Sequence, residues 1–240
     1  MKTFSETRAG INRSVNQDCF LCEEGAVGEF SNLFIVADGM GGHNGGDFAS
    51  KFCIENVKDY IVKNSGDSII SIIRSAIKAA NEGIRDKTKM DEELKGCGTT
   101  VVLSTIKDDI LYIANVGDSR LYVFQNGKLS QITEDHSVVE EMIKSGLIKK
   151  EEARFNPHKN KVTRALGAEP EIEVDFFEVK LEKGARILMC SDGVSNMMDE
   201  RNIEEIVGAD KEVPEICKIL IDTAVNNGGK DDATVVMIEV

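Results

Sequence analysis

The segment Leu33–Gly42, LFIVADGMGG, strongly limits how this chain can fold. It begins with an unbroken apolar run that includes β-branched residues, which is typical of a strand buried on both faces. Asp38 follows the run, and Gly39, Gly41 and Gly42 are expected to end the strand because glycine frees the backbone to turn. A carboxylate at the end of a buried strand is costly unless a cation lies beside it. The segment predicts either a cation site at Asp38 or a turn in which Asp38 accepts backbone N–H bonds.

The combination of a strand and an aspartate recurs along the chain. Asp118 and Asp192 come shortly after apolar segments, whereas Asp18 and Asp231 come shortly before them. The segments concerned are 19–22, 110–116, 185–190 and 233–238. Because neighbouring antiparallel strands run in opposite directions, these aspartates can gather at one sheet edge with Asp38. Clustered carboxylates repel one another without cations, and ligand sets made only of oxygen suit Mg²⁺ or Mn²⁺. The alternative is a set of unrelated turn aspartates.

Composition restricts the class of protein. The 240 residues fit one large domain or two small ones. With 42 acidic and 29 basic residues the net charge is −13, which argues against nucleic acid or an anionic membrane surface as a partner. No apolar run approaches the roughly 20 residues of a membrane span, and the first ten residues lack the apolar core of a signal peptide. We therefore expect a cytoplasmic protein without membrane insertion.

The chain contains six cysteines, of which Cys19 and Cys22 have the CxxC spacing of metal and redox sites. There is no second pair of this kind, and the chain has only three histidines. Buried free thiols in a reducing compartment are the preferred interpretation, and a zinc or redox role for this pair is the alternative.

Periodicity predicts helices at 47–64, from 69 to about 80 after a cap at Asp67 or Ser68, and near 213–225. Strands are expected at about 1–9, 19–24, 33–37, 128–132, 172–180, 185–190 and 233–238, with three more between 96 and 125. Helices inserted among mainly antiparallel strands indicate an α+β sandwich with the helices outside.

Residues 137–168 form a mostly polar insertion between strands. Ser137 is expected to cap a short helix that Gly146 ends, and a second short helix can start within Lys149–Ala153. Insertions of this kind often carry specificity, so we expect this segment to govern the choice of substrate more than the chemistry.

Eight short motifs follow one another along the chain. They are RSVNQD at 13–18, DGMGGHNGGDFAS at 38–50, GTT at 98–100, NVGDSR at 115–120, TEDHS at 133–137, TRALG at 163–167, SDG at 191–193 and GGKDDATV at 228–235. In this order they resemble the PPM/PP2C metal-dependent protein serine/threonine phosphatases, in their compact bacterial form, over nearly the whole chain. The resemblance implies an α+β fold, a four-layer αββα sandwich of two antiparallel β-sheets flanked by helices. It also implies a single domain over residues 1–240, with a flap insertion at about 137–168.

The resemblance implies two core ions, Mn²⁺ or Mg²⁺. Asp18, Asp38 and the carbonyl of Gly39 would hold one ion, and Asp38, Asp192 and Asp231 would hold the other, with Asp38 bridging the two. Such a pair of ions lowers the pKa of a shared water. The resulting hydroxide would attack phosphorus in line with the serine or threonine leaving oxygen, so no protein nucleophile is expected.

The resemblance implies two further roles. Asp118 would share a third, weaker ion with Asp192, although Asp118 could instead pair with Arg120 or accept turn hydrogen bonds. Arg13 would bind the substrate phosphate through its planar guanidinium group.

The chain also departs from the family at several positions. The neutral Gln17 stands where many members have glutamate, so we expect it to act only outside the ligand shell.

Met40 stands where eukaryotic members have a histidine that is suggested to be the general acid. His43 is a candidate for that role here, although structural support of the glycine loop is the preferred interpretation. His136 is expected to anchor the start of the insertion, with a catalytic role as the alternative. His158 is expected to lie on the surface of the insertion, and Asp232 to orient its neighbours rather than bind metal.

These observations favour an enzyme that hydrolyses phosphoserine and phosphothreonine in proteins and acts in signalling. Its expected partners are phosphoprotein substrates and a cognate Ser/Thr kinase, and the chain is expected to be a monomer. The alternatives are a non-catalytic scaffold or sensor module of the same fold and a hydrolase of small phosphomonoesters. A decayed site should have lost some of its carboxylates, whereas Asp18, Asp38, Asp192 and Asp231 are all retained together with Arg13.

Overall fold

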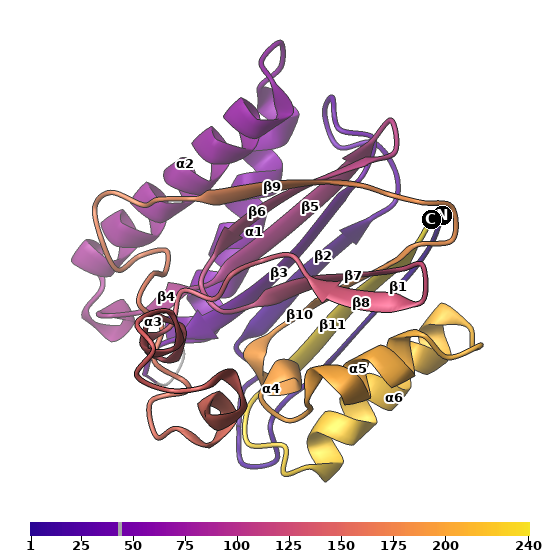
Figure 1. The fold of residues 1–240 in the computed structure, drawn as a ribbon. Helices are drawn as coiled ribbons and strands as arrows, with labels where there is room; N and C mark the ends of the chain where they lie inside the picture. The colour runs from indigo at the N-terminus through magenta and orange to yellow at the C-terminus, as the bar shows by residue number, and fades with distance from the viewer. Residues whose placement is uncertain (43–44) are drawn as a thin grey trace.

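The computed structural model describes residues 1–42 and 45–240, and Figure 1 shows two β-sheets stacked between layers of helices. One sheet has the strand order β1-β11-β10-β7-β8 and the other the order β2-β3-β5-β6-β9, with β4 paired to the end of β3. The strand pairs are antiparallel. The predicted α+β, four-layer αββα sandwich is therefore confirmed.

The first sheet is formed by β1 (Lys2–Arg8), β7 (Arg120–Gln125), β8 (Lys128–Gln131), β10 (Arg186–Cys190) and β11 (Ala233–Glu239). The second is formed by β2 (Asp18–Glu23), β3 (Leu33–Met40), β4 (Gly98–Thr99), β5 (Val101–Lys107), β6 (Ile110–Val116) and β9 (Asp175–Lys180). The helices are α1 (Gly45–Lys63), α2 (Ile69–Met90), α3 (Val138–Lys144), α4 (Asp192–Ser195), α5 (Glu200–Val207) and α6 (Val213–Asn226), with short 3₁₀ helices η1 (Glu92–Leu94) and η2 (Lys150–Phe155).

Helices α1 and α2 cover the outer face of the second sheet. Ser68 begins α2 by accepting the Ser71 N–H with its hydroxyl, as one of the two predicted caps. The buried face of α2 recurs at helical spacing and consists of Ile72, Ile73, Ala76, Ile77, Ala80, Asn81 and Ile84. This face packs against α1 and β6, and α1 in turn packs against alternate residues of β3, including Leu33 and Ile35.

The continuous apolar run in β3 is explained by its position between two cores. Leu33, Ile35 and Ala37 face the helices, whereas Phe34 and Val36 face the other sheet. All five side chains are fully buried. A strand with one face in water would instead alternate apolar and polar residues.

Helices α5 and α6 cover the outer face of the first sheet and close the fourth layer (Figure 1). Helices α4 and α5 were not predicted, because helices of four and eight residues are too short to show a clear period in the sequence. The two chain ends meet at the far end of the sandwich, where Lys2 of β1 lies opposite Glu239 of β11.

One part of the strand prediction was wrong. Strand β3 does not end at Asp38, because Gly39 pairs with Thr99 and Met40 pairs with Gly98. Glycine is needed at position 39 for close packing, since a Cβ there would lie 2.1 Å from the carbonyl oxygen of Gly46 at the start of α1. Asp38 therefore stands inside a paired strand.

The insertion at 137–168, called the flap below, lies between β8 and β9. Ser137 caps α3 as predicted, accepting the Glu140 N–H at 3.2 Å. The second predicted helix is the 3₁₀ helix η2.

None of the helices in the described ranges combines the length and the apolar character needed to cross a bilayer.

Candidate metal centre and active site

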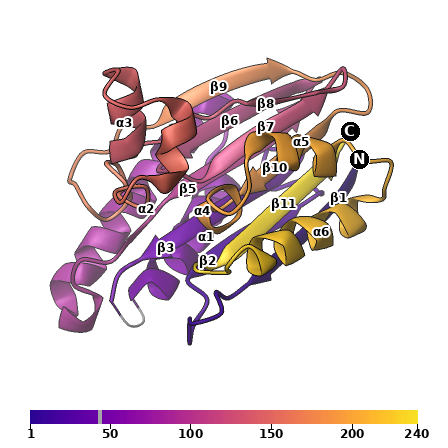
Figure 2. The same ribbon diagram turned by 60° about the horizontal axis from the view of Figure 1, so that its bottom comes forward.

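The five predicted aspartates lie at one end of the sandwich, and they come from both sheets. Asp18 and Asp38 are register partners on β2 and β3, Asp118 follows β6, Asp192 begins α4 after β10, and Asp231 precedes β11. Charges of the other four all act on Asp38. The prediction that they meet at the edge of a single sheet was therefore too narrow, because the strand ends of two stacked sheets supply them. Figure 1 shows α3, β4 and α4 at this same end, and Figure 2 shows α3 and α4 there from another side.

A cavity of about 320 Å³ opens at this end of the molecule. It is lined by Arg13, Gln17, Asp38, Gly39, Met40, Gly41, Thr100, Asp118, Asn160, Val162, Asp192 and Asp231. Asn160 and Val162 belong to the flap, so the flap forms part of the wall. Asp18 is not in the lining and is buried in β2 beside Asp38.

Asp18 has one carboxylate oxygen held by the protein and one without a partner. Oδ2 accepts hydrogen bonds from the hydroxyl groups of Ser191 and Thr234, at 2.7 and 2.6 Å. Oδ1 is buried and has no hydrogen-bond partner among the described residues. The pKa of Asp18 is raised to about 7, chiefly by burial; the charges of Asp232 and Asp192 act in the same direction, and the two hydroxyl hydrogen bonds oppose them. An unpartnered buried oxygen of this kind is costly unless a cation meets it.

Asp192 repeats this arrangement. Its Oδ2 accepts a hydrogen bond from Asn196 Nδ2 at 2.9 Å, whereas Oδ1 is buried without a partner in the described part of the chain. Burial raises the pKa of Asp192 to about 6, and repulsion from Asp231 acts in the same direction. A hydrogen bond with Asp38 acts in the opposite direction and lowers the pKa of Asp192.

Asp38 lies at the centre of the cluster, on a backbone that is tightly fixed. Its N–H donates to Thr100 Oγ1 at 3.0 Å, and its carbonyl accepts from the Thr100 N–H at 2.9 Å and the Thr99 hydroxyl at 3.0 Å. The Thr100 hydroxyl also shares a 2.8 Å hydrogen bond with Ser119, next to Asp118. Burial, and then the neighbouring carboxylates, raise the pKa of Asp38 well above its usual range.

These residues fit hard divalent cations. Within residues 1–42 and 45–240, no three carboxylate, imidazole or thiol groups are placed closely enough to hold an ion as they stand. However, Asp18 and Asp192 each present an unpartnered buried oxygen to the cluster. The donors are all oxygens, which is the chemistry that Mn²⁺ and Mg²⁺ require.

Asp118 is buried and does not form the predicted alternative pair with Arg120. The Arg120 guanidinium donates instead to Asp135, with Nε at 2.9 and 3.0 Å and Nη2 at 2.7 Å, and to the Tyr122 hydroxyl at 3.0 Å. Burial raises the pKa of Asp118 well above its usual range, Asp192 adds to this, and the nearby Arg120 charge opposes it. A hydrogen bond from the backbone N–H of Asp118, which belongs to the second predicted alternative, also lowers this pKa, but no ion pair with Arg120 occupies the carboxylate.

Arg13 lies at the rim of the cluster. Its Nη1 donates to Gln17 Oε1 at 3.1 Å, and its Nη2 contacts Asp231. Asp232 holds the loop that carries Arg13, because its carboxylate accepts the N–H groups of Gly10 and Gln17 at 2.9 and 2.8 Å. As expected from the sequence, Asp232 thus orients its neighbours.

The three histidines differ in their placement. His136 Nδ1 accepts the Gly117 N–H, and its Nε2 lies 3.0 Å from Asp175, so this residue anchors the base of the flap as expected. His158 is exposed on the flap. His43, the candidate general acid, lies outside the described residues.

Sequence reasoning missed the residues that orient the carboxylates. Ser191 and Thr234 act on Asp18 from 173 and 216 positions away in the chain, and no local pattern reveals such pairs. Asn196 lies four residues after Asp192, and side chains at this spacing are neighbours on a helix. This contact could have been predicted only if the short helix α4 had been recognised in the sequence.

Comparison with known proteins gives consistent matches over the chain. The family model described as protein phosphatase 2C matches residues 8–223. The serine/threonine phosphatase stp of Listeria monocytogenes is 39% identical over 211 residues, which cover 86% of this chain and 84% of that protein.

Solved structures agree with this similarity. The serine/threonine phosphatase PstP/Ppp of Mycobacterium tuberculosis has a TM-score of 0.90 at 31% identity, covering 100% of this chain and 98% of that one. A PstP catalytic domain in complex with two manganese ions has a TM-score of 0.86 at 31% identity, covering 98% and 96% of the two chains.

Proposed function

The chain belongs to the protein phosphatase 2C family, and we propose that the aspartate cluster is the catalytic centre of a metal-dependent protein serine/threonine phosphatase. The observation that carries this proposal is the pair of unpartnered, buried carboxylate oxygens of Asp18 and Asp192 within the cluster. The substrates are phosphoproteins, and the alternative of a non-catalytic module is not favoured. The test is the release of inorganic phosphate from a phosphothreonine peptide by the wild-type protein, beside an Asp38→Asn variant.

The ligands we propose are Asp18, Asp38 and the carbonyl of Gly39 for one ion, and Asp38, Asp192 and Asp231 for the other. Manganese is supported by the related PstP domain that binds two such ions, and Mg²⁺ is the alternative. When bound, the ions lower the pKa of a water molecule and withdraw charge from the phosphate oxygens. The chain itself contributes orientation: hydroxyl groups fix the Asp18 carboxylate, and hydrogen bonds from threonines fix the Asp38 backbone.

Arg13 is proposed to bind the substrate phosphate. Gln17 and Asp231 hold its guanidinium group at the cavity, where the planar fork matches two phosphate oxygens. Arg13→Ala is expected to raise KM about tenfold, with a smaller effect on kcat, because the lost interaction is already present in the ground state. Steady-state kinetics on a phosphothreonine peptide measure this.

Arg8→Ala is the matched control, because the Arg8 side chain is 38% exposed, close to the 36% of Arg13, and also pairs with acidic residues. Arg8 lies in β1, outside the cavity lining. Unchanged kinetics in Arg13→Ala, or an equal rise of KM in Arg8→Ala, would contradict the assignment.

Asp118 is proposed to hold a third, weaker ion together with Asp192. Few protein carboxylates serve this ion, so its affinity should be low. Asp118→Asn keeps the shape of the side chain and removes its charge, so we expect two ions to bind tightly while kcat falls at least about tenfold, which is ~1.4 kcal/mol of barrier. Calorimetric titration with Mn²⁺ beside turnover measurements tests this. Normal turnover at low and high Mn²⁺ would remove Asp118 from the mechanism, and loss of the tight ions would place it in the core.

Several further proposals rest on the family. We infer that residues 1–240 act as a single catalytic domain and that the flap governs the choice of phosphoprotein. We also infer that the enzyme opposes a Ser/Thr kinase in the cytoplasm and acts as a monomer. His43 remains the candidate general acid.

A further inference from the structure

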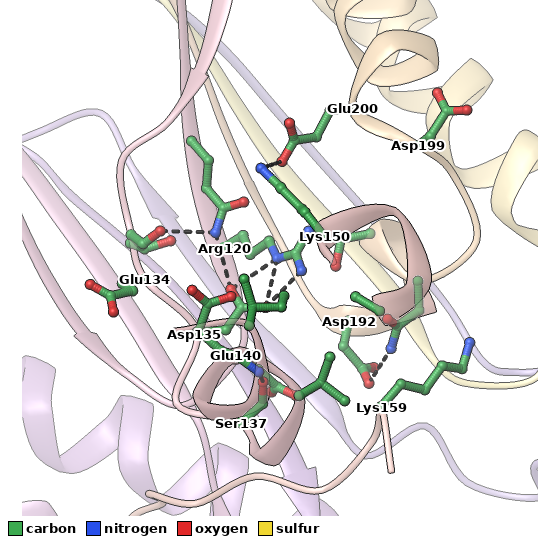
Figure 3. Close-up of a pocket in the computed structure, with 18 of the residues that line it drawn as sticks. Arg120, Glu134, Asp135, Ser137, Glu140, Lys150, Lys159, Asp192, Asp199 and Glu200 are labelled. Carbon is green, nitrogen blue, oxygen red and sulfur yellow. Dashed lines mark hydrogen bonds and ion pairs between the residues drawn. The ribbon is translucent and has the colours of Figure 1, made fainter. Parts of the chain in front are cut away.

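A second cavity, of about 540 Å³, adjoins the metal centre (Figure 3). Asp118 and Asp192 line both cavities, so the two meet at these residues. Helix α3 and the 3₁₀ helix η2 of the flap supply one wall, and the segment from α4 to the start of α5 supplies another. A polypeptide whose phosphorylated side chain reaches the aspartates can therefore place a neighbouring side chain in this second cavity.

The basic groups in the wall are occupied by the protein's own acids. Arg120 donates to both oxygens of Asp135, and Lys150 contacts Glu200 at 2.7 Å, which joins the flap to α5. The positive charge of Lys159 acts on Asp192. The lining contains eight acidic and four basic side chains, so the cavity has a surplus of negative charge.

Outside the metal centre, Glu140 and the exposed Glu151 are the acidic residues of this wall that form no ion pair within the described part of the chain, and Glu140 is the half-buried one. It lies in the first turn of α3, where Ser137 accepts its backbone N–H. Its side chain is half-buried, and in the described part of the chain no hydrogen bond or ion pair engages its carboxylate. Burial raises the pKa of Glu140, repulsion from Asp135 adds to the effect, and Arg120 and Lys150 only partly offset it. A cation that enters the cavity would relieve this cost.

We propose that this cavity is a subsite for an arginine or lysine side chain near the phosphorylated residue of the substrate, with Glu140 as the specificity-determining carboxylate. This inference rests on the proposed phosphatase function and names the class of its substrate. The apolar stem of a basic side chain also finds partners in the lining, namely Val139, Ile143 and Met198. The net charge of −13 favours the approach of basic segments to the molecule.

The experiment compares phosphothreonine peptides that differ in one residue. The reference peptide has alanine at three positions on each side of phosphothreonine, and each test peptide has arginine at one of these positions. The quantity measured is the ratio of kcat/KM for the arginine peptide to kcat/KM for the reference. For the wild type we expect about a tenfold ratio at one position, falling as salt screens the charge pair. In Glu140→Gln the ratio at that position should fall to below twofold.

Glu141→Gln is the matched control, because Glu141 is the next residue of α3, is exposed and does not line the cavity. It should retain the wild-type ratio. Glu140→Lys should reverse the preference, so that a glutamate peptide is cleaved faster than the arginine peptide.

A ratio near one at every position in the wild type would overturn the subsite. So would a preference that survives Glu140→Gln, or a Glu140→Gln variant that loses turnover of both peptides equally. Hydrolysis of the reference peptide by the wild type distinguishes a failure of the proposed phosphatase function from a failure of the proposed subsite. If no phosphopeptide is hydrolysed, the proposed function itself fails, whereas hydrolysis without arginine preference contradicts only the subsite.

Discussion

Asp38→Asn is expected to lower turnover of a phosphothreonine peptide by about a thousandfold, because it removes the carboxylate proposed to bridge the two core ions. A loss of this size corresponds to ~4 kcal/mol of barrier, which lies within the several kcal/mol that bound metal ions contribute to phosphoryl chemistry. Asparagine has nearly the same shape as aspartate, and the backbone bonds of residue 38 to Thr99 and Thr100 do not involve its side chain. The variant should therefore remain folded.

The same substitution should stabilise the metal-free protein. Asp38 is buried and repelled by Asp18, Asp192, Asp118 and Asp231, so the charged side chain costs free energy of folding when no cation is bound. In the presence of a chelator, we expect Asp38→Asn to unfold at a higher temperature than the wild type, by roughly 2–4 °C for each kcal/mol of repulsion removed. Thermal unfolding followed by circular dichroism measures this shift.

Asp59→Asn provides the control for both measurements. Asp59 loses the same charge, but it lies on the outer surface of α1 in an exposed pair with Lys63, so neither turnover nor unfolding temperature should change appreciably. Turnover of Asp38→Asn within tenfold of wild type would exclude Asp38 as the bridging ligand. A lower unfolding temperature in chelator would show that the aspartate charge is compensated within the protein.

The sequence was informative wherever a local pattern reports burial or charge. The run from Leu33 to Ala37 predicts a strand buried on both faces, and the sandwich explains this because β3 lies between the helices and the other sheet. Each aspartate of the cluster was found because it stands next to an apolar strand segment. Ser137 was correctly identified as a helix cap because capping is a property of neighbouring residues.

The rest of the site depends on contacts between distant parts of the chain. Arg120 lies two residues from Asp118, and the sequence therefore suggested that the two could pair, but the fold places Asp135 against the guanidinium group instead. Gly39 was interpreted as a turn residue, whereas it is glycine because α1 approaches the strand closely at this point. Neither contact leaves a signal in the local sequence, because Asp135 and helix α1 lie in other parts of the chain than the residues they contact.

Removal of metal ions should abolish turnover, and adding Mn²⁺ should restore it. The ligand set we propose contains only oxygen atoms, so chelation leaves several carboxylates, with pKa values raised by burial, facing one another. Assays of the chelated protein on p-nitrophenyl phosphate and on a phosphothreonine peptide measure the loss, with the metal content determined in the same sample. Turnover that persists in a sample free of divalent ions would contradict the proposed mechanism.

Mn²⁺ should also stabilise the fold, which gives a measure of binding that does not depend on activity. At a concentration 100 times its dissociation constant, an ion that binds only the folded state adds about 2.7 kcal/mol. For a chain of this size we therefore expect the unfolding temperature to rise by roughly 5–10 °C. The rise should be smaller in Asp38→Asn, which lacks the bridging carboxylate, and unchanged in Asp59→Asn. An equal rise in the wild type and in Asp38→Asn would mean that the stabilising ions bind away from the aspartate cluster.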